Sequence, residues 1–157
     1  MSRRTEIRMD SAEVAAYLAR QQVIQVATIG PRGRPHLAPL WYALREPDAG
    51  RPVLVTWTYA KSQKTANLRR VPEATVLAES GDSYLALRGV SMECDVEVVE
   101  DYQQTFDIGV ALIDRYGSAY NAERSVMIAA FEQQAAKRVG LVLTATKVVS
   151  WDHSKMG

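Results

Sequence analysis

Apolar and polar side chains alternate along the first third of the chain in a pattern typical of β-strands. Residues 23–29 are rich in β-branched side chains and stop at the turn sequence GPRG, and a second extended run covers residues 36–44. This pattern predicts a β-hairpin. Pro39 lies inside the second run and has no N–H to donate. The segment is therefore an edge strand, a bulge, or a stretch that pairs with something other than a strand.

Four further segments have the character of strands. They are residues 53–59, 75–79, 84–99 and a last strand that carries Val139, Leu141, Leu143, Ala145, Val149 and Trp151 on one side. Between Met92 and Val98, apolar side chains alternate with acidic ones, which is expected where one face of a strand is buried and the other meets water. We expect a bulge near Gly89 in this long strand.

Helices are predicted around the strands. A capping box at residues 10–13 begins a short helix that ends near residue 20, and Ser62 is a good N-cap for a helix that ends before Pro72. Two longer helices cover residues 101–116 and 122–136. The predicted fold is mainly β, a six-stranded antiparallel split barrel with peripheral helices, in which closure removes exposed strand edges. No linker divides residues 1–157, so a single domain is expected.

Composition narrows the class of protein. Of the 157 residues, 47% are apolar and 24% charged, which is the balance of a globular domain, and a net charge of +1 gives no field to recruit nucleic acid or a membrane. With Cys94 as the single cysteine, no internal disulfide is possible, and a cytoplasmic setting is expected. His36 and His153 lie far apart in the sequence, so no metal site is expected. The N-terminus does not read as a secretory signal.

The most informative segment runs from Lys61 to Pro72 (KSQKTANLRRVP). It follows a predicted strand and opens a predicted helix, so free backbone N–H groups and the positive end of the helix dipole converge at its start. Lys61 and Lys64 can lie on one side of the first turn, while the Ser62 hydroxyl can cap the helix or contact an anion. This combination suits a phosphate dianion. A capped surface helix with solvated lysines is the alternative interpretation.

The order of the elements, and the run Lys61-Ser-x-Lys-x-x-Asn-Leu-Arg-x-x-Pro72, resemble the pyridoxamine 5′-phosphate oxidase-like split-barrel superfamily. Within it, the chain looks most similar to the flavin- and deazaflavin (F420)-dependent oxidoreductases over residues 10–155. The resemblance implies that Lys61, Ser62 and Lys64 hold the phosphate of the cofactor. It also implies that Asn67 lies near the same site, with bracing of the helix as the alternative.

At one position the chain departs from the family pattern. Members often carry an arginine in or just after the third strand, where this chain has Tyr59 and Ala60. The contacts to the phosphate are therefore expected to differ in detail from those of the family.

The resemblance assigns the flavin-type ring to the hairpin arm that contains Pro39. Backbone groups that a proline leaves outside the sheet can hydrogen-bond the pyrimidine edge of the ring. The expected cofactor contacts are Pro39, Leu40, Trp41 and Tyr42 from this arm, and Thr56 and Trp57 late in the third strand. The alternative is that Trp41 and Tyr42 are ordinary barrel side chains.

The family places its C-terminal segment close to the cofactor of the partner subunit, which implies a homodimer. Trp151, His153 and Lys155 are then candidates for contributions across the interface, and a frayed terminus is the alternative. FMN and coenzyme F420 share a tricyclic ring and a phosphate, but F420 also carries an anionic oligoglutamate tail. Basic side chains that can line a groove for that tail are Arg32, Arg34, Lys61, Lys64, Arg69 and Arg70. F420 is the expected cofactor, with FMN as the alternative.

These expectations describe an F420-dependent oxidoreductase that transfers a hydride between the deazaflavin and a small conjugated substrate. The cofactor carries the hydride chemistry and the protein supplies position and electrostatics, so no catalytic triad is required. His36 is a candidate proton donor, and a structural histidine is the alternative. The competing class is a non-catalytic carrier of a flavin, F420 or haem. An oligonucleotide-binding barrel is disfavoured because lysines and exposed aromatics do not interleave.

Overall fold

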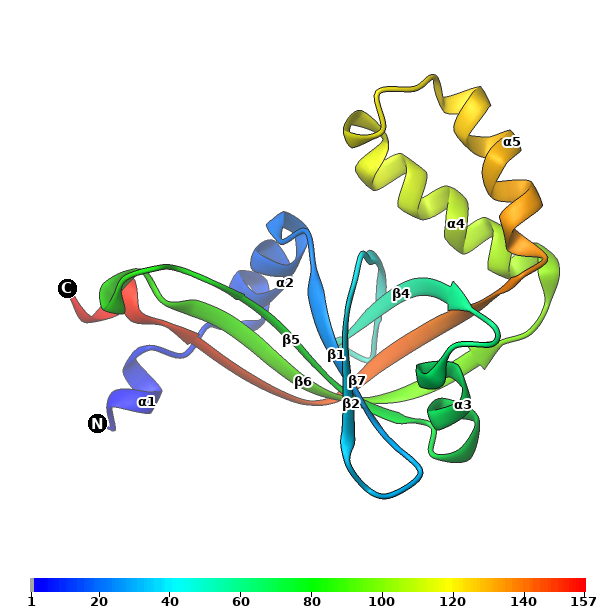
Figure 1. The fold of residues 1–157 in the computed structure, drawn as a ribbon. Helices are drawn as coiled ribbons and strands as arrows, with labels where there is room; N and C mark the ends of the chain where they lie inside the picture. The colour runs from blue at the N-terminus through cyan, green and yellow to red at the C-terminus, as the bar shows by residue number, and fades with distance from the viewer. Residues whose placement is uncertain (1) are drawn as a thin grey trace.

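The structure is a computed structural model that describes residues 2–157. One antiparallel sheet contains seven strands in the order β2-β1-β5-β6-β7-β4-β3 (Figure 1). The strands are β1 (Ile24–Ile29), β2 (Pro35–Leu40), β3 (Ala43–Asp48), β4 (Arg51–Tyr59), β5 (Glu73–Ser80), β6 (Arg88–Val99) and β7 (Arg138–Asp152). The helices are α1 (Arg3–Glu6), α2 (Ser11–Arg20), α3 (Gln63–Arg70), α4 (Tyr102–Tyr116) and α5 (Arg124–Ala135), with 3-10 turns at Tyr84–Ala86, Gly117–Ala119 and His153–Met156.

The two outermost strands of the sheet, β2 and β3, follow each other in the chain with only Trp41 and Tyr42 between them. Because so short a connection spans at most about 10 Å, the sheet has to coil until its edges come close at this crossover. The split-barrel class with peripheral helices is therefore confirmed. Within residues 2–157, β2 and β3 do not pair with each other, so the expected closure that removes exposed strand edges is wrong. The expected count of six strands is wrong, since the run 36–44 breaks at Trp41 into two strands that pair with different neighbours, β1 and β4.

Two hairpins, β1–β2 and β3–β4, pair the edge strands of the sheet with their neighbours. The β1–β2 hairpin is present, and Pro39 lies in an edge strand, one of the places where a residue without an N–H is tolerated. Between the predicted strands 36–44 and 53–59, residues 46–51 are mostly strand as well. Ala49 (φ 49°) and Gly50 (φ 77°) both adopt left-handed conformations, as a tight two-residue hairpin turn requires, so β3 and β4 extend to the turn.

Strand β4 separates two apolar cores. Leu54 faces the interior of the coiled sheet, where α2 contributes side chains such as Leu18 to the same core. Val55 and Trp57 face the other way and pack with the α4–α5 hairpin. Because strand residues alternate between faces, a strand with a core on each side is buried on both faces, as β4 is from Val53 to Thr58.

A bulge changes the orientation of the end of β7. The register with β6 shifts at Cys94 and leaves Thr146 without a cross-strand partner. An extra residue reverses which face the following side chains occupy, so Val149 is 50% exposed instead of buried. The expected single face for residues 139–151 is thus wrong, and so is the expected position of the bulge near Gly89. Trp151 lies on the face opposite the first half of the strand.

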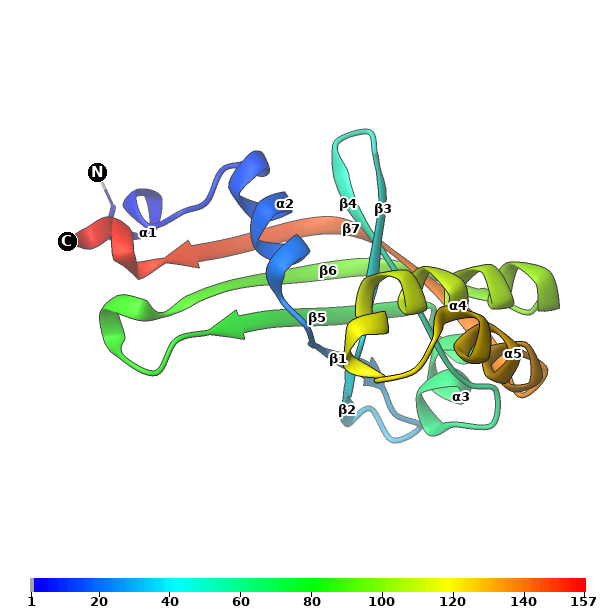
Figure 2. The same ribbon diagram turned by 90° about the horizontal axis from the view of Figure 1, so that it is seen from above.

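Beyond the bulge, β5, β6 and β7 run side by side toward the end of the molecule that holds α1 and the C-terminus (Figures 1 and 2). The segment before α2 lies along this end of β7, because the Asp152 N–H donates to the Ile7 carbonyl (2.7 Å) and the Met9 N–H donates to Ser150 Oγ (3.1 Å). Within residues 2–157, no helix combines the length and the apolar character needed to cross a membrane.

Candidate functional site

Helix α3 begins where the sequence predicts. Ser62 is its N-cap, and the Ser62 hydroxyl oxygen accepts a hydrogen bond from the Thr65 N–H (3.3 Å). The Thr65 hydroxyl donates to the Tyr59 carbonyl (2.9 Å) and lies 3.0 Å from Ser62 Oγ. These bonds fix the turn between β4 and α3, so the first amides of the helix point in a defined direction.

Two cations lie close together near this turn. Lys64 is half-buried, and burial together with the positive charge of Arg138 holds the pKa of Lys64 below its ordinary value. Burial also lowers the pKa of Arg138. Within residues 2–157, neither side chain forms an ion pair with a carboxylate. Desolvated cations that repel each other are unfavourable for the protein alone, and a bound anion relieves this cost. Lys61 is exposed.

Arg138 is the first residue of β7 and lies directly across from Tyr59 in the register with β4. Its guanidinium carbon is 4.2 Å from the centroid of the Tyr59 ring and 4.7 Å from that of Trp57, and Nη2 donates to Gln134 Oε1 (2.9 Å). The Nε atom of Arg138 is buried and has no hydrogen-bond partner in the described chain.

Arg138 is not among the residues predicted from the sequence. A signal was present, because the expected family arginine is absent at Tyr59 and Ala60. The pairing of β4 with β7 brings an arginine from a distant part of the chain to the cross-strand position beside Tyr59.

Trp41 lies at the crossover between β2 and β3 and is 37% exposed. Its ring stacks on Tyr116 with centroids 4.4 Å apart and planes 16° from parallel, and it meets the Tyr120 ring edge-on at 5.6 Å. The Thr56 hydroxyl donates to the Trp41 carbonyl (2.6 Å). The indole is therefore held from its backbone and from one face, and part of its surface stays accessible.

The predicted ring contact Tyr42 lies in the interior and is 0% exposed. Its hydroxyl donates to the Leu18 carbonyl (2.5 Å), its N–H donates to the Tyr116 hydroxyl, and its carbonyl accepts bonds from Tyr116 and Arg115. Neither the side chain nor the backbone of Tyr42 has a group left for a ligand. The alternative interpretation, an ordinary barrel side chain, describes Tyr42.

The other predicted ring contacts divide between interior and surface. Thr56 and Trp57 are 1% and 7% exposed, and Trp57 packs against Phe131 with ring centroids 4.8 Å apart. Pro39 is exposed on the edge strand, and Leu40 is half-buried beside it. Of the predicted ring contacts, Trp41 thus combines a fixed position with an accessible ring.

A chain of aromatic contacts joins Trp41 to the two cations. The Tyr120 ring contacts Trp41 on one side and Phe131 on the other, with 6.0 Å between the centroids of Tyr120 and Phe131. Phe131 packs on Trp57, and the Arg138 guanidinium lies over the Trp57 ring. These contacts run along the α4–α5 hairpin from the predicted ring segment to Arg138, whose charge acts on Lys64 of the predicted phosphate segment. We refer to Trp41, Trp57, Tyr59, Lys64, Tyr120, Phe131 and Arg138 as the aromatic–cationic cluster.

Asn67 is fully buried and connects α3 to the sheet. Its Nδ2 donates to Thr28 Oγ1 (3.0 Å), and its Oδ1 accepts from Gln63 Nε2 (2.8 Å). Both ends of the amide are occupied, which makes Asn67 a brace for the helix. His36 lies opposite Thr28 in the β1–β2 register, and its Nδ1 atom is buried without a partner in residues 2–157.

The remaining predicted residues lie elsewhere or are engaged by the protein. Trp151 packs over Gly89 at the far end of the sheet, and His153 Nδ1 lies 2.8 Å from the Tyr84 carbonyl oxygen. Lys155 forms an ion pair with Glu13 (2.7 Å). Within this chain, the C-terminal residues lie at the opposite end of the molecule from α3 (Figure 1).

Arg69 and Arg70, which the sequence offered for an anionic tail, already have partners. Arg69 pairs with Glu100 through two hydrogen bonds (2.9 and 3.2 Å), and Arg70 donates to the Ile29 carbonyl. Arg32 and Arg34 in the β1–β2 turn are exposed.

The coiled sheet, its crossover and the capped helix after β4 place the protein among the split barrels of the pyridoxamine 5′-phosphate oxidase type. The family model described as pyridoxamine 5′-phosphate oxidase matches residues 11–152, so the chain belongs to this family. A search of curated proteins gives no significant match.

Among solved structures, a conserved hypothetical protein from Mycobacterium tuberculosis is 41% identical, with a TM-score of 0.83 over 100% of this chain and 93% of that one. A protein described as an F420 reductase is 25% identical, with a TM-score of 0.63 over 85% of this chain and 93% of that one. A haem storage protein from Vibrio cholerae is 13% identical (TM-score 0.68, covering 91% and 96% of the two chains) and shows the fold alone.

Proposed function

We propose that the protein is an F420-dependent oxidoreductase of the cytoplasm, a single domain that binds the cofactor at a homodimer interface. FMN is the alternative cofactor. The similarity to an F420 reductase supports this proposal, and the observation that carries it is the pair of uncompensated cations, Lys64 and Arg138, beside the start of α3.

The residues present fit a phosphate. Lys64 supplies an ammonium group, Arg138 supplies a guanidinium whose buried Nε lacks a partner, and the capped start of α3 supplies amide donors. Lys61 is exposed and free to swing toward the same anion, and the Ser62 hydroxyl is close enough to the helix start to contribute. Asn67 supports the site indirectly, because it holds α3 against β1.

The accessible part of the Trp41 ring, with Pro39 and Leu40 on the adjacent edge strand, is the surface on which we place the planar ring. Stacking on Tyr116 and the bond from Thr56 keep the indole in one orientation, so little conformational entropy is lost on binding. When bound, F420 supplies two-electron hydride chemistry, and the chain orients the ring and limits access of water. We propose a small conjugated molecule as the substrate, and Trp151 as a contribution from the partner subunit.

The first test is binding. We expect wild-type protein to bind F420, and the double variant Lys61→Ala/Lys64→Ala to lose about 2 kcal/mol, or roughly 30-fold in Kd, because two charge-assisted contacts to phosphate are removed. Lys147→Ala is the control, since this lysine is equally charged and pairs with Glu93 on another part of the surface. Unchanged affinity in the double variant would remove the phosphate site from α3. A parallel titration with FMN decides between the two cofactors.

The second test separates an enzyme from a carrier. Protein loaded with reduced F420 is mixed with enones, quinones and tetrapyrroles, and cofactor oxidation is followed by absorbance. Substrate-dependent oxidation supports the oxidoreductase. Tight binding of F420, a flavin or haem without turnover identifies a non-catalytic carrier instead.

A further inference from the structure

A second cluster of unpaired positive charge lies at the other end of the molecule, beside the N-terminal segment. A pocket of about 420 Å³ lies between the start of α2, the β3–β4 turn and the end of β7, and we call it the Arg8 pocket. Its lining includes Arg8, Ser11, Val14, Pro52, Val148 and Ser150. The volume falls within the range of roughly 300–1,000 Å³ that is typical of small-molecule sites.

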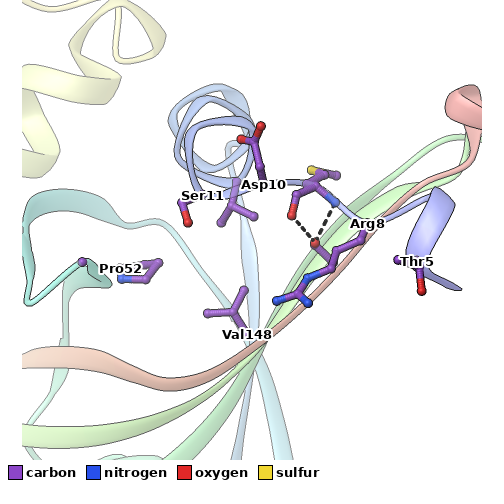
Figure 3. Close-up of a pocket in the computed structure, with 10 residues that line it drawn as sticks. Thr5, Arg8, Asp10, Ser11, Pro52 and Val148 are labelled. Carbon is purple, nitrogen blue, oxygen red and sulfur yellow. Dashed lines mark hydrogen bonds between the residues drawn. The ribbon is translucent and has the colours of Figure 1, made fainter.

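The Arg8 side chain is presented from a fixed backbone. The Arg8 carbonyl accepts a bond from Lys155 Nζ (2.9 Å), and the next residue, Met9, exchanges two bonds with the Ser150 hydroxyl (3.1 and 3.3 Å). From this position the Arg8 guanidinium reaches toward Val148 (Figure 3). The Arg8 side chain is exposed, so its guanidinium is accessible to an anion from this anchored backbone.

In the part of the chain that the structure describes, no carboxylate forms an ion pair with Arg8. Asp10 is the one acidic residue in the lining, and its carboxylate caps α2 by accepting the Glu13 N–H (2.8 Å). Arg4 and Arg8 line a second hollow of about 730 Å³ that adjoins the Arg8 pocket and shares Thr5, Arg8, Val148 and Ser150 with it. Within residues 2–157, neither arginine forms an ion pair.

The edge of β7 adds backbone donors to the same place. The Asp152 N–H points away from β6, because it donates to the Ile7 carbonyl. Residues 148–152 pair regularly with 88–92 of β6, and backbone groups alternate sides along a strand, so the N–H groups of Val148 and Ser150 also point away from β6. The pairing of β4 with β7 ends at Thr144, so no strand covers this edge within the described chain.

We propose that the Arg8 pocket binds a small organic carboxylate with an apolar body. The carboxylate pairs with the Arg8 guanidinium and accepts from the β7 edge amides, while the body packs on Val14, Pro52 and Val148. Both halves of such a ligand are matched, because apolar walls lie next to an uncompensated cation. This site goes beyond the proposed function, since none of the residues that line the Arg8 pocket is among the proposed cofactor contacts. Trp151, which we place at the partner subunit's cofactor, lines only the adjoining hollow. Within one chain the pocket lies at the end of the sheet remote from α3 (Figure 1).

The test uses 2-naphthoate as the probe, titrated calorimetrically into the full chain. We expect saturable binding, about tenfold weaker in Arg8→Gln because one charge-assisted contact is lost. Arg3→Gln is the matched control, since it removes the same charge from α1 but lines neither hollow. Ser11→Phe fills the pocket from an exposed position and is expected to abolish binding, while thermal melting verifies that this variant folds.

Three further measurements locate the site. The amide resonances of Val148 and Ser150 should shift on titration with 2-naphthoate, and the neutral analogue 2-naphthylmethanol should bind about tenfold more weakly. Lys61→Ala/Lys64→Ala should leave naphthoate binding unchanged, which separates this site from the proposed cofactor site. The proposal fails if naphthoate does not bind, if Arg8→Gln binds as tightly as wild type, or if triglutamate binds there and naphthoate does not.

Discussion

Arg115 joins three segments of the chain, and its removal should be the most damaging change of a partly exposed side chain. The guanidinium donates to the Tyr42 carbonyl (2.7 Å) and to three carbonyls at the end of α2, those of Leu18 (2.9 Å), Ala19 (3.3 Å) and Gln21 (2.5 Å). It also lies over the Tyr42 ring, 4.2 Å from the centroid. Arg115 thus binds both the end of α2 and the crossover beside Trp41. Helix α2 contributes side chains to the core inside the coiled sheet.

The expected cost of Arg115→Met follows from these contacts. A hydrogen bond to a charged group contributes about 1.5–3 kcal/mol, but the contributions are not additive, and carbonyls at a helix end recover part of the loss through water. We therefore expect a loss of about 3 kcal/mol in the free energy of unfolding. For a chain of this length each kcal/mol lowers Tm by roughly 2–4 °C, so Tm should fall by about 6–12 °C.

Urea unfolding and thermal melts measure this cost. Arg115→Lys should recover only part of it, because an ammonium group cannot reach all the carbonyls that a guanidinium bridges. Arg124→Met is the control, since Arg124 forms an exposed ion pair with Asp114 (2.8 Å), and such pairs contribute about 0–1 kcal/mol. Our reasoning is refuted if Arg115→Met stays within about 1 kcal/mol of wild type, or if Arg115→Lys matches wild type.

Three further predictions concern single residues. Gly109→Ala should lower the free energy of unfolding, measured in urea, by about 1–3 kcal/mol, because the added Cβ would lie 2.7 Å from the Trp57 ring. This cost is expected to exceed the gain from the better helix propensity of alanine. A gain in stability would show that α4 shifts freely. Burial, with a smaller effect of the Asp95 carboxylate, raises the pKa of the Cys94 thiol to about 12. Iodoacetamide at pH 8 should therefore label Cys94 only after denaturation, which mass spectrometry would show. Rapid labelling of the native protein would contradict this prediction. Burial and the charge of Arg138 hold the pKa of Lys64 below its ordinary value of 10.5. The affinity for F420, measured by fluorescence titration, should therefore fall as pH rises through that lowered pKa, and Lys64→Arg should remove this pH dependence. A flat pH profile of the wild-type affinity would exclude contact between F420 and Lys64.

Features that depend on a few neighbouring residues were predictable from the sequence. The capping box at the start of α2 forms as expected, with the Asp10 carboxylate and the Glu13 carboxylate each accepting the other's backbone N–H (2.8 and 2.7 Å). Ser62 caps α3 in the same local manner. These contacts are decided within one helical turn, so the sequence is sufficient to place them.

Features that depend on the pairing of distant strands were not predictable. The break at Trp41 follows from the opposite edges of the sheet meeting there, and the unpaired Thr146 follows from a register shift with β6. The cluster of Lys64 with Arg138 arises because β7 pairs with β4 across about eighty residues of sequence. Neither local propensity nor hydrophobic periodicity carries information on these partners.

The crossover at Trp41 and Tyr42 also fixes where the length of this chain can change. If a residue inserted between β2 and β3 were accommodated by a one-position slip of either edge strand, the side chains of that strand would turn to the other face, since strand positions repeat with a period of two. At the tip of the β1–β2 hairpin, a Cβ added to Gly33 would meet no atom of the described chain within 4 Å, so this turn can lengthen outward into solvent. Affinity tags or fluorophores therefore belong at this tip, and natural variation in loop length among relatives should accumulate there while the crossover stays at two residues.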